Sequence, residues 1–195
     1  MNFVFDEKTH VYKLDNRPLV SVTQTLKGAG LVEYDNLPIS KDVLERSRIR
    51  GKAVHAACHY FDEGDLKRET LDPALVGYVA AWEKFKVESG VIIEQIEKAM
   101  YHPTYLYAGM LDRVLVRAGR RGVYDIKTYE CAAWTALQLA GYELMARPVD
   151  EAPWERWGVW LKPDGNYKME QFKDRTDAQV FLACLTVTNW RRTHE

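Results

Sequence analysis

The fold is decided by residues 109–128, which read GMLDRVLVRAGRRGVYDIKT. Apolar and β-branched side chains are frequent in residues 113–116 and 123–126, and the polar run 117–122 between them contains two glycines. Two β-type runs joined by a short glycine-bearing loop predict a β-hairpin. We therefore expect two antiparallel strands at the centre of the domain.

Three charged residues accompany this hairpin: Asp112, Asp125 and Lys127. Side chains two residues apart on a strand point to the same face, so Asp125 and Lys127 project together. If residue 116 pairs with residue 123, the ladder places Asp112 opposite Lys127 and diagonal to Asp125. Such neighbours lie within roughly 5 to 8 Å of each other. The hairpin therefore predicts a cluster of two carboxylates and one ammonium group.

This cluster has two interpretations. Charged groups within apolar strands cost free energy unless they are compensated, and a bound cation together with an anionic substrate would compensate them. The alternative is an ordinary cross-strand ion pair on a solvated face, which sheets often carry. The neighbouring motifs favour the first interpretation.

Several short motifs occur in a characteristic order and spacing. They are Gly51-x-x-x-His55, Glu97, Gly109-x-x-Asp112, Asp125-x-Lys127-Thr128 and Gln138-x-x-x-Tyr142. In this order they resemble the PD-(D/E)XK nuclease superfamily, specifically its RecB-like and phage exonuclease branch. The opening residues 5–23 are similar to the N-terminal segment of phage members, so the resemblance runs from the first strand to about Tyr142.

The pattern of elements predicts one domain over residues 1–195. We expect strands at 3–5, 10–14, 91–100, 109–116, 123–128, 154–162 and 167–172, and helices at 21–28, 40–61, 72–90, 131–145 and 176–191. This order predicts an α/β or α+β fold with a central mixed sheet flanked by helices. The resemblance implies the restriction-endonuclease-like form of that fold.

The chemistry implied by the resemblance is metal-dependent phosphodiester hydrolysis. Carboxylates suit Mg²⁺ or Mn²⁺, so Asp112 and Asp125 are the expected first ligands. The resemblance adds the backbone carbonyl of Ile126 and the imidazole of His55, which favours Mn²⁺ slightly. Lys127 would position the attacking water and offset charge on the phosphorus. From the residues alone, His55 is more often a satisfied core histidine than a ligand.

The remaining site residues have weaker assignments. Glu97 would bind a second metal ion or orient a water or the histidine, and Glu94 is a competing choice. Gln138 and Tyr142, one helical turn apart, would support Lys127 and touch the DNA, although they could also simply face solvent.

Aromatic and histidine side chains near the motifs also have two interpretations. Trp134 or Tyr129 could stack on a base, or Trp134 could be a core residue. His59 shares a helix face with His55, but residue 56 is alanine rather than the glutamate of a helical zinc protease.

The amino-acid composition limits the classes of protein to which the chain can belong. The chain has 195 residues, 47% of them hydrophobic and 28% charged, and a formal net charge of −1. That net charge does not indicate nucleic-acid binding, although basic residues cluster at 46–52, 117–121 and 191–192. Three scattered cysteines suggest neither a disulfide framework nor a zinc or iron–sulfur site. With no membrane-length apolar run and no secretory leader, we expect a cytoplasmic protein, in the host cytoplasm if phage-encoded.

The sequence thus predicts a DNA nuclease that uses Mg²⁺ or Mn²⁺, namely a sequence-nonspecific exonuclease of phage-type recombination or repair acting on linear ends. A single-strand annealing protein and further copies of the chain are the expected partners, with no membrane. The alternative is a catalytically inactive nuclease-fold protein that binds nucleic acid or acts as a scaffold. Endonuclease action, strand polarity and a preference for RNA stay open at this point.

Overall fold

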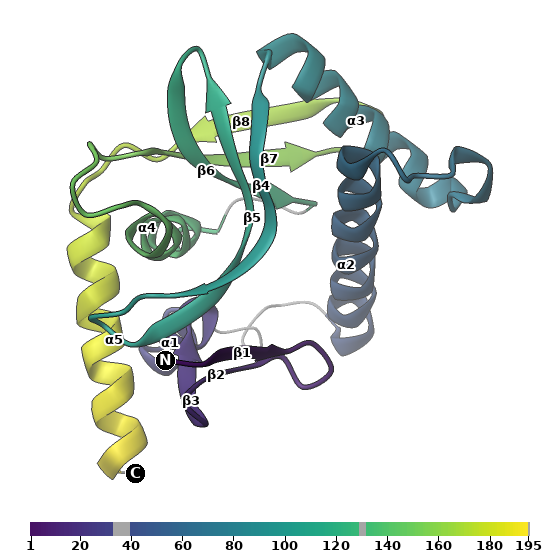
Figure 1. Ribbon diagram of the computed structural model, residues 1–195. Coiled ribbons are helices and arrows are strands. Elements are labelled where there is room, and N and C mark those ends of the chain that lie inside the picture. The colour runs from purple at the N-terminus through teal and green to yellow at the C-terminus, as the bar shows by residue number, and fades with distance from the viewer. Residues whose placement is uncertain (33–39, 129–131, 195) are drawn as a thin grey trace.

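The computed structural model describes residues 1–32, 40–128 and 132–194. Within these ranges it is a mixed α/β protein in which eight strands form one sheet, flanked by five α-helices (Figure 1). The strands are β1 (Phe3–Asp6), β2 (Val11–Leu14), β3 (Arg17–Ser21), β4 (Ile92–Tyr101), β5 (Tyr107–Arg117), β6 (Arg120–Lys127), β7 (Glu155–Leu161) and β8 (Tyr167–Gln171). The helices are α1 (Val22–Gly28), α2 (Lys41–Glu63), α3 (Pro73–Ser89), α4 (Thr135–Ala146) and α5 (Asp177–His194), with a short 3₁₀ turn, η1 (Arg68–Thr70).

The sheet is mostly antiparallel. Its strand order is β1-β2-β3-β5-β6-β7-β8, and β4 pairs with β5 off this path. The pairs β3–β5 and β6–β7 are parallel, and the other pairs are antiparallel. The predicted central mixed sheet flanked by helices is therefore confirmed at this level.

Helices cover both faces of the sheet and enclose two apolar cores (Figure 1). On one face α1, α4 and α5 pack around buried residues that include Leu26, Leu139 and Phe181. On the other face α2 and α3 pack against β5, β6 and β7 around Trp82, Phe85 and Ile126. Burying both faces gives most of the favourable free energy of folding, since it removes large apolar areas from water.

One edge of β5 is shared by two different strands. Ala108 pairs with Ser21 of β3 on this edge and with Tyr101 of β4 on the other. The ladder to β6 starts at Arg113, which is likewise paired with β4 on its other side. β3 and β6 therefore flank the same edge of β5, and their ladders leave residues 109–112 between them. This opening in the sheet positions the candidate site.

A buried charge cluster fastens α2 to the rest of the protein. The Asp62 carboxylate of α2 accepts hydrogen bonds from Trp82 Nε1 at 2.9 Å, Lys86 Nζ at 2.7 Å and Arg113 Nε at 2.8 Å. The side chains of Asp62 and Arg113 are both fully buried. Because Asp62 joins α2 to α3 and β5 at once, it determines where the preceding turns of α2, including His55, meet the sheet.

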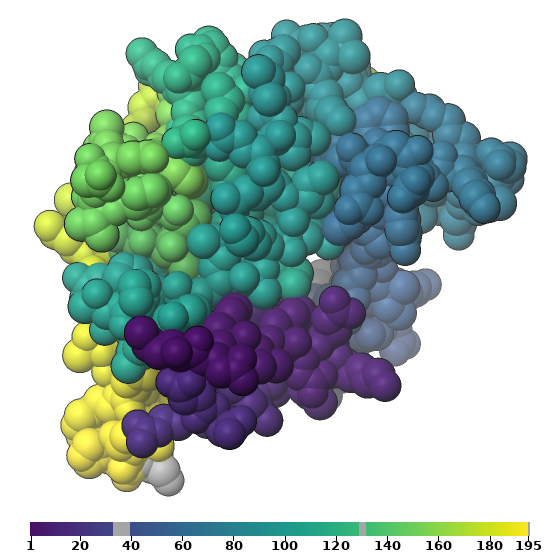
Figure 2. Space-filling view, viewed as in Figure 1, coloured from purple at the N-terminus to yellow at the C-terminus, as the bar shows by residue number. Residues whose placement is uncertain are grey.

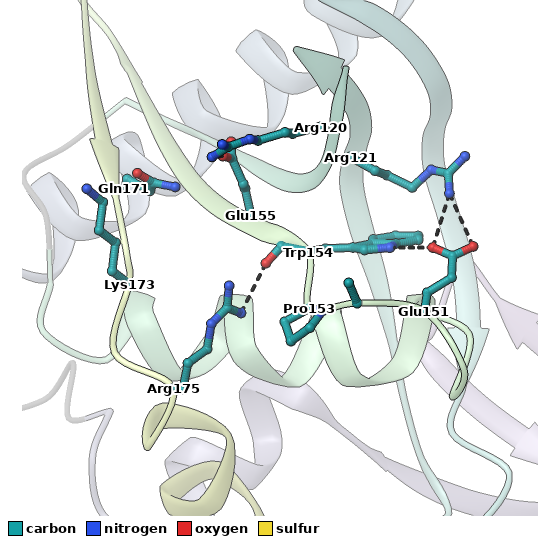
Figure 3. A pocket seen from close by; sticks show the side chains of 10 residues that line it. Arg120, Arg121, Glu151, Pro153, Trp154, Glu155, Gln171, Lys173 and Arg175 are labelled. Atoms are coloured by element: carbon teal, nitrogen blue, oxygen red, sulfur yellow. Dashed lines mark hydrogen bonds and ion pairs between the residues drawn. The ribbon is translucent and has the colours of Figure 1, made fainter. Parts of the chain in front are cut away.

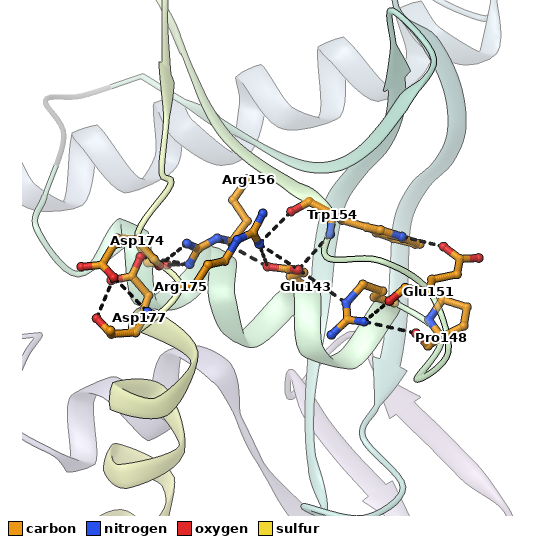
Figure 4. A network of polar contacts seen from close by, with 11 residues as sticks. Glu143, Pro148, Glu151, Trp154, Arg156, Asp174, Arg175 and Asp177 are labelled. Atoms are coloured by element: carbon orange, nitrogen blue, oxygen red, sulfur yellow. Dashed lines mark hydrogen bonds and ion pairs between the residues drawn. The ribbon is translucent and has the colours of Figure 1, made fainter.

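A second polar network holds α4 and α5 against the sheet (Figure 4). Arg156 of β7 is buried and lies 3.4 Å from Glu143 of α4 and 3.0 Å from Asp177 of α5. Arg175 also reaches Glu143, at 3.2 Å, and donates to the carbonyl of Trp154. This network orients α4, and with it the side chains that α4 directs toward β6.

The predicted hairpin is present, but its predicted register is wrong. Val114 pairs with Val123, so the ladder is shifted by two residues from the expected pairing. The turn is only Ala118-Gly119, both at positive φ (48° and 74°), because such two-residue turns match the twist of the strands. A shift of two keeps every side chain on its face. Asp125 and Lys127 therefore still share a face, whereas Asp112 lies just beyond the last pair of the ladder, Arg113–Tyr124, and is not paired with Lys127.

Two element boundaries and the buried face of one helix also differ from the prediction. Residues 17–18, which lie outside every predicted strand, begin β3, because Asp15 and Asn16 at positive φ form a tight turn by themselves. Of the apolar residues of α2, only Val54, Ala57 and Cys58 are buried, and Val43 and Ile49 in its first half are exposed. The described part of the helix predicted at 131–145 runs from Thr135 to Ala146. Residues 33–38 and residue 131 lie outside the described ranges.

The described ranges also bear on membrane-spanning helices and on the cysteines. No helix there is long and apolar enough to cross a membrane. Cys58 and Cys184 are free thiols in the two cores, and Cys131 lies outside the described residues.

We predict that Asp62→Asn lowers the free energy of unfolding by about 3–5 kcal/mol, because the amide leaves two buried or half-buried cations without their carboxylate. Urea unfolding followed by circular dichroism measures this change. Glu45→Gln, on the exposed part of α2, is the control and should change stability by less than about 0.5 kcal/mol. Equal stabilities of the two variants would show that Asp62 does not fasten α2.

Candidate functional site

A cleft of about 610 Å³ lies at the opening beside β5. Its walls come from four parts of the chain: the N-terminal strands and the start of α1, the middle of α2, β4 with β5, and α4. In Figure 2 the N-terminal strands (purple) lie against the teal surface of β4 and β5. The lining includes the predicted site residues His55, Glu97, Asp112 and Tyr142.

The backbone of Ile126 forms the inner edge of the site. Here β6 has left the β5 ladder, and side chains take the place of the missing strand partners. The Ile126 N–H donates to Asp112 Oδ2 at 2.8 Å, and the Ile126 carbonyl oxygen lies 2.9 Å from His55 Nε2. Buried backbone groups need such partners, because an unpaired one costs about as much as a lost hydrogen bond. Residues 55, 112 and 126 therefore meet at one point.

His55 occupies the position of a cation in this arrangement. Its Nδ1 is 3.5 Å from Asp112 Oδ1, while its other nitrogen faces the Ile126 carbonyl. Burial opposes the charged imidazolium, but the Asp112 carboxylate outweighs burial and raises the pKa of His55. A positively charged ring between two oxygen acceptors satisfies both of them.

Lys127 is held in a buried chain of polar side chains. Its Nζ lies 2.5 Å from Asp125 Oδ2 and donates to Gln138 Oε1 at 3.0 Å. Gln138 Nε2 in turn donates to the Tyr142 hydroxyl at 3.5 Å. Asp125, Lys127, Gln138 and Tyr142 are all buried. The alternative that Gln138 and Tyr142 face solvent is therefore wrong, because α4 packs this face onto β6.

The two aspartates differ in their ionisation. Burial alone would raise the pKa of Asp112, but the charges of His55 and Lys127 and the Ile126 N–H lower it overall. For Asp125, burial dominates and, with the Asp112 charge, raises the pKa to about 6 despite Lys127. Neighbouring carboxyls whose pKa values are pushed apart are characteristic of sites that handle protons or cations.

The donor set suits a hard divalent cation. His55, Asp112 and the Ile126 carbonyl already converge, and a cation could replace the imidazole N–H as the partner of that carbonyl. In the described residues, however, no three His, Cys, Asp or Glu side chains gather around one point. The Asp125 carboxylate instead faces Lys127, and it would have to turn to become a further ligand. The residues thus fit the expected ion in donor chemistry.

Glu97 lies in the cleft, and Glu94 does not. The Glu97 carboxylate is 3.0 Å from His59 Nδ1 and 3.8 Å from Arg113 Nη1, whereas Glu94 binds Arg121 at 2.5 and 2.9 Å. Glu97 also has φ +39°, a conformation that costs a non-glycine residue energy and that is common at functional sites. Its contacts make it a support for α2 rather than a direct partner of Asp112.

Three further residues named with the sequence motifs are Trp134, Tyr129 and Gly51. Trp134 packs against the apolar core with its ring 5.6 Å from Lys127 Nζ, and Tyr129 lies outside the described residues. Gly51 of the Gly-x-x-x-His motif makes no close approach to another backbone segment. The nearest atom to a Cβ there would be Thr128 Oγ1, at an ordinary contact distance of 3.7 Å.

The glycine that the site does require is Gly109. A Cβ at this position would lie 2.9 Å from Tyr142 Cε1 and 3.2 Å from Val22 Cγ2. The absence of a Cβ at Gly109 lets the Tyr142 ring lie over β5 and brings Gln138 toward Lys127. Sequence reasoning noted Gly109 only as part of a motif, and nothing local indicated that α4 crosses it. His10 and the α1 start, which also line the cleft, were missed for the same reason.

Another cavity, of about 640 Å³, lies beside β6, β7 and β8 (Figure 3). Its arginines are engaged by carboxylates: Arg120 by Glu155, Arg121 by Glu94 and Glu151, and Arg175 by Glu143. These pairs offset the charge of the three arginines and connect β6, β7 and α4 at that end of the sheet, and Lys173 is a further basic residue of the lining.

Comparisons with known proteins do not assign a family. No family model matches the chain, and no curated protein matches it. The solved structure of SSO0001 matches with 14% sequence identity and a TM-score of 0.38, covering 87% of this chain and 84% of that one. A likeness of this strength carries no argument about function.

We predict that Gly109→Ala destabilises the protein by about 1–3 kcal/mol, because the new methyl group overpacks against Tyr142. Gly51→Ala is the matched control. There is room for its methyl group and it removes a helical glycine, so stability should stay equal or rise by up to about 1 kcal/mol. Thermal unfolding of both variants measures the difference. A Gly109→Ala protein as stable as Gly51→Ala would contradict the packing described for Tyr142.

Proposed function

We propose that the chain is a metal-dependent deoxyribonuclease of the PD-(D/E)XK type with a restriction-endonuclease-like sheet. One observation carries the proposal: the opening between β3 and β6 brings His55, Asp112 and the Ile126 carbonyl together beside the Asp125–Lys127 pair. His55 and Ile126 are 71 positions apart in the chain. We further propose a sequence-nonspecific exonuclease of phage-type recombination or repair.

Each residue of the site has a proposed role. Asp112, Asp125, His55 and the Ile126 carbonyl would hold Mg²⁺ or Mn²⁺, which when bound supplies positive charge against the phosphate. The low pKa of Asp112 keeps this carboxylate ionised for that role. His55 would give up its proton and its contact with the Ile126 carbonyl when it becomes a ligand.

Lys127 has the position of the group that acts on the phosphate. Gln138 holds its ammonium group inside the protein, so the charge stays aimed at the site and loses little freedom on reaction. Turning of Asp125 toward a cation would release Lys127 to orient the attacking water and to offset charge on the phosphorus. Burial raises the pKa of Tyr142, so its hydroxyl stays neutral and supports Gln138.

We predict that the protein degrades linear DNA with Mg²⁺ or Mn²⁺ and not with chelator, while circular DNA is spared. Lys127→Ala should lower the rate by at least about 100-fold, the usual size of such electrostatic or proton-transfer contributions. Lys168→Ala, an exposed lysine on β8, should keep the wild-type rate. Gel assays on matched linear and circular DNA measure this.

Two results would contradict the proposal. Full activity of Lys127→Ala would remove the role assigned to that lysine. Failure of the wild type to cut DNA with either metal would favour the inactive nucleic-acid-binding or scaffold alternative, and cutting of circles would replace exonuclease with endonuclease action.

We also predict that Asp112→Asn weakens Mn²⁺ binding at least about 10-fold, since it removes a charged ligand and the partner of His55. Glu97→Gln is the matched control, because Glu97 contacts His59 and Arg113 instead and should leave the affinity within about threefold. Isothermal titration calorimetry with Mn²⁺ gives both affinities. Equal loss in the two variants would mean that Glu97 is itself a ligand.

A further inference from the structure

A second groove, of about 630 Å³, runs between α1 and α5. It is lined by Val20, Gln24, Lys27, Gly28, Thr188, Arg191 and Arg192. Every charged side chain in this lining is positive. The groove therefore differs from the cavity beside β6, β7 and β8, whose arginines face carboxylates.

The floor of the groove is built by contacts between the two helices. Thr188 Oγ1 donates to the Thr25 carbonyl at 2.7 Å, and Arg191 Nη1 donates to the Gly28 carbonyl at 2.7 Å. Gly28 allows this close approach, because a Cβ there would lie 2.5 Å from Thr188 Cγ2. These contacts fix α5 on α1 and leave the side chains of Lys27 and Arg192 exposed at the groove.

The groove adjoins the candidate active-site cleft at α1. Gln24 of α1 lines both hollows, and Val20 of the groove is followed in the chain by Ser21 of the cleft. Lys27 lies one helical turn beyond Gln24. A strand leaving the cleft past Gln24 would therefore enter the groove that Lys27 and Arg192 line.

The charges of the two hollows complement each other. The lining of the cleft combines the carboxylates of Asp112 and Glu97 with the basic side chains of Lys52 and His55, so it offers a polyanion little net positive charge. Positive charge nearby is needed to hold a phosphate chain across such a site. The whole chain has a net charge of −1, so this attraction has to come from a local patch.

We infer that the α1–α5 groove binds the phosphodiester backbone of the DNA strand whose scissile bond lies in the cleft, with Lys27 and Arg192 each neutralising a phosphate. This inference rests on the proposed function, since it takes DNA as the substrate. It assigns a binding role to α5, which the sequence motifs do not reach. Arg191 serves instead to hold α5 on α1.

The test measures binding separately from cutting. Fluorescence anisotropy with a labelled 20-nucleotide DNA, as single strand and as duplex, is recorded in chelator over a range of salt concentrations. The Lys27→Ala/Arg192→Ala double variant should lose on the order of tenfold in affinity at 0.1 M salt. The slope of log K against log salt should fall by about 1.4 for a single strand or 1.8 for a duplex, for two phosphate contacts.

The control is Lys162→Ala/Lys168→Ala, which removes the same charge from exposed positions at β7 and β8 and should change neither value. Circular dichroism verifies that both double variants are folded. Wild-type affinity and slope in the Lys27→Ala/Arg192→Ala protein, or equal losses in the two double variants, would overturn the inference. So would a wild type that binds neither form of DNA.

The outcomes also separate this inference from the proposed function. A wild type that cuts DNA, together with normal DNA binding by the Lys27→Ala/Arg192→Ala variant, would support the nuclease proposal and contradict the DNA-binding role of the groove. A wild type that binds DNA through Lys27 and Arg192 but does not cut it with either metal would support the DNA-binding role of the groove and contradict the nuclease proposal.

Discussion

The structure of the site depends on how the backbone of Ile126 is satisfied. Where β6 separates from β5, the Ile126 amide and carbonyl lose their place in the ladder, and buried backbone groups cannot be left unpaired. Asp112 from β5 and His55 from α2 supply the partners. The separation of the strands, the position of α2 and the orientation of Asp112 therefore depend on one another, and the cleft follows from them.

Charge is balanced locally at two levels. Within the site, His55 offsets Asp112 and Lys127 offsets Asp125, which keeps several ionisable groups tolerable in a largely buried place. Outside it, Asp62 with Arg113 and Glu143 with Arg156 hold α2 and α4 on opposite faces of the sheet. The outer pairs have many hydrogen bonds and a structural role. The inner pairs have fewer partners and line or adjoin the cleft, and under the proposed function they are the pairs that a cation would rearrange.

Local sequence patterns predicted most of the elements. The predicted strands at 91–100, 109–116 and 123–128 and the predicted helix starts at residues 40 and 72 all correspond to observed elements, because capping and side-chain alternation act over a few residues. The hairpin register was wrong because Ala118-Gly119 alone makes the turn. The α2 stripe was wrong because periodicity does not reveal how much of a long helix reaches the sheet.

The sequence by itself predicted the class of fold and the grouping of Asp112, Asp125 and Lys127, since these follow from residue types and short spacings, whereas the choice of His55 came from the resemblance to a nuclease superfamily. Only the tertiary structure decided that β3 and β6 share one edge of β5, that Gly109 makes room for Tyr142, and that α5 forms a basic groove with α1. The physical reason is distance along the chain. These contacts join segments separated by tens to more than a hundred residues, and packing, not local preference, selects them.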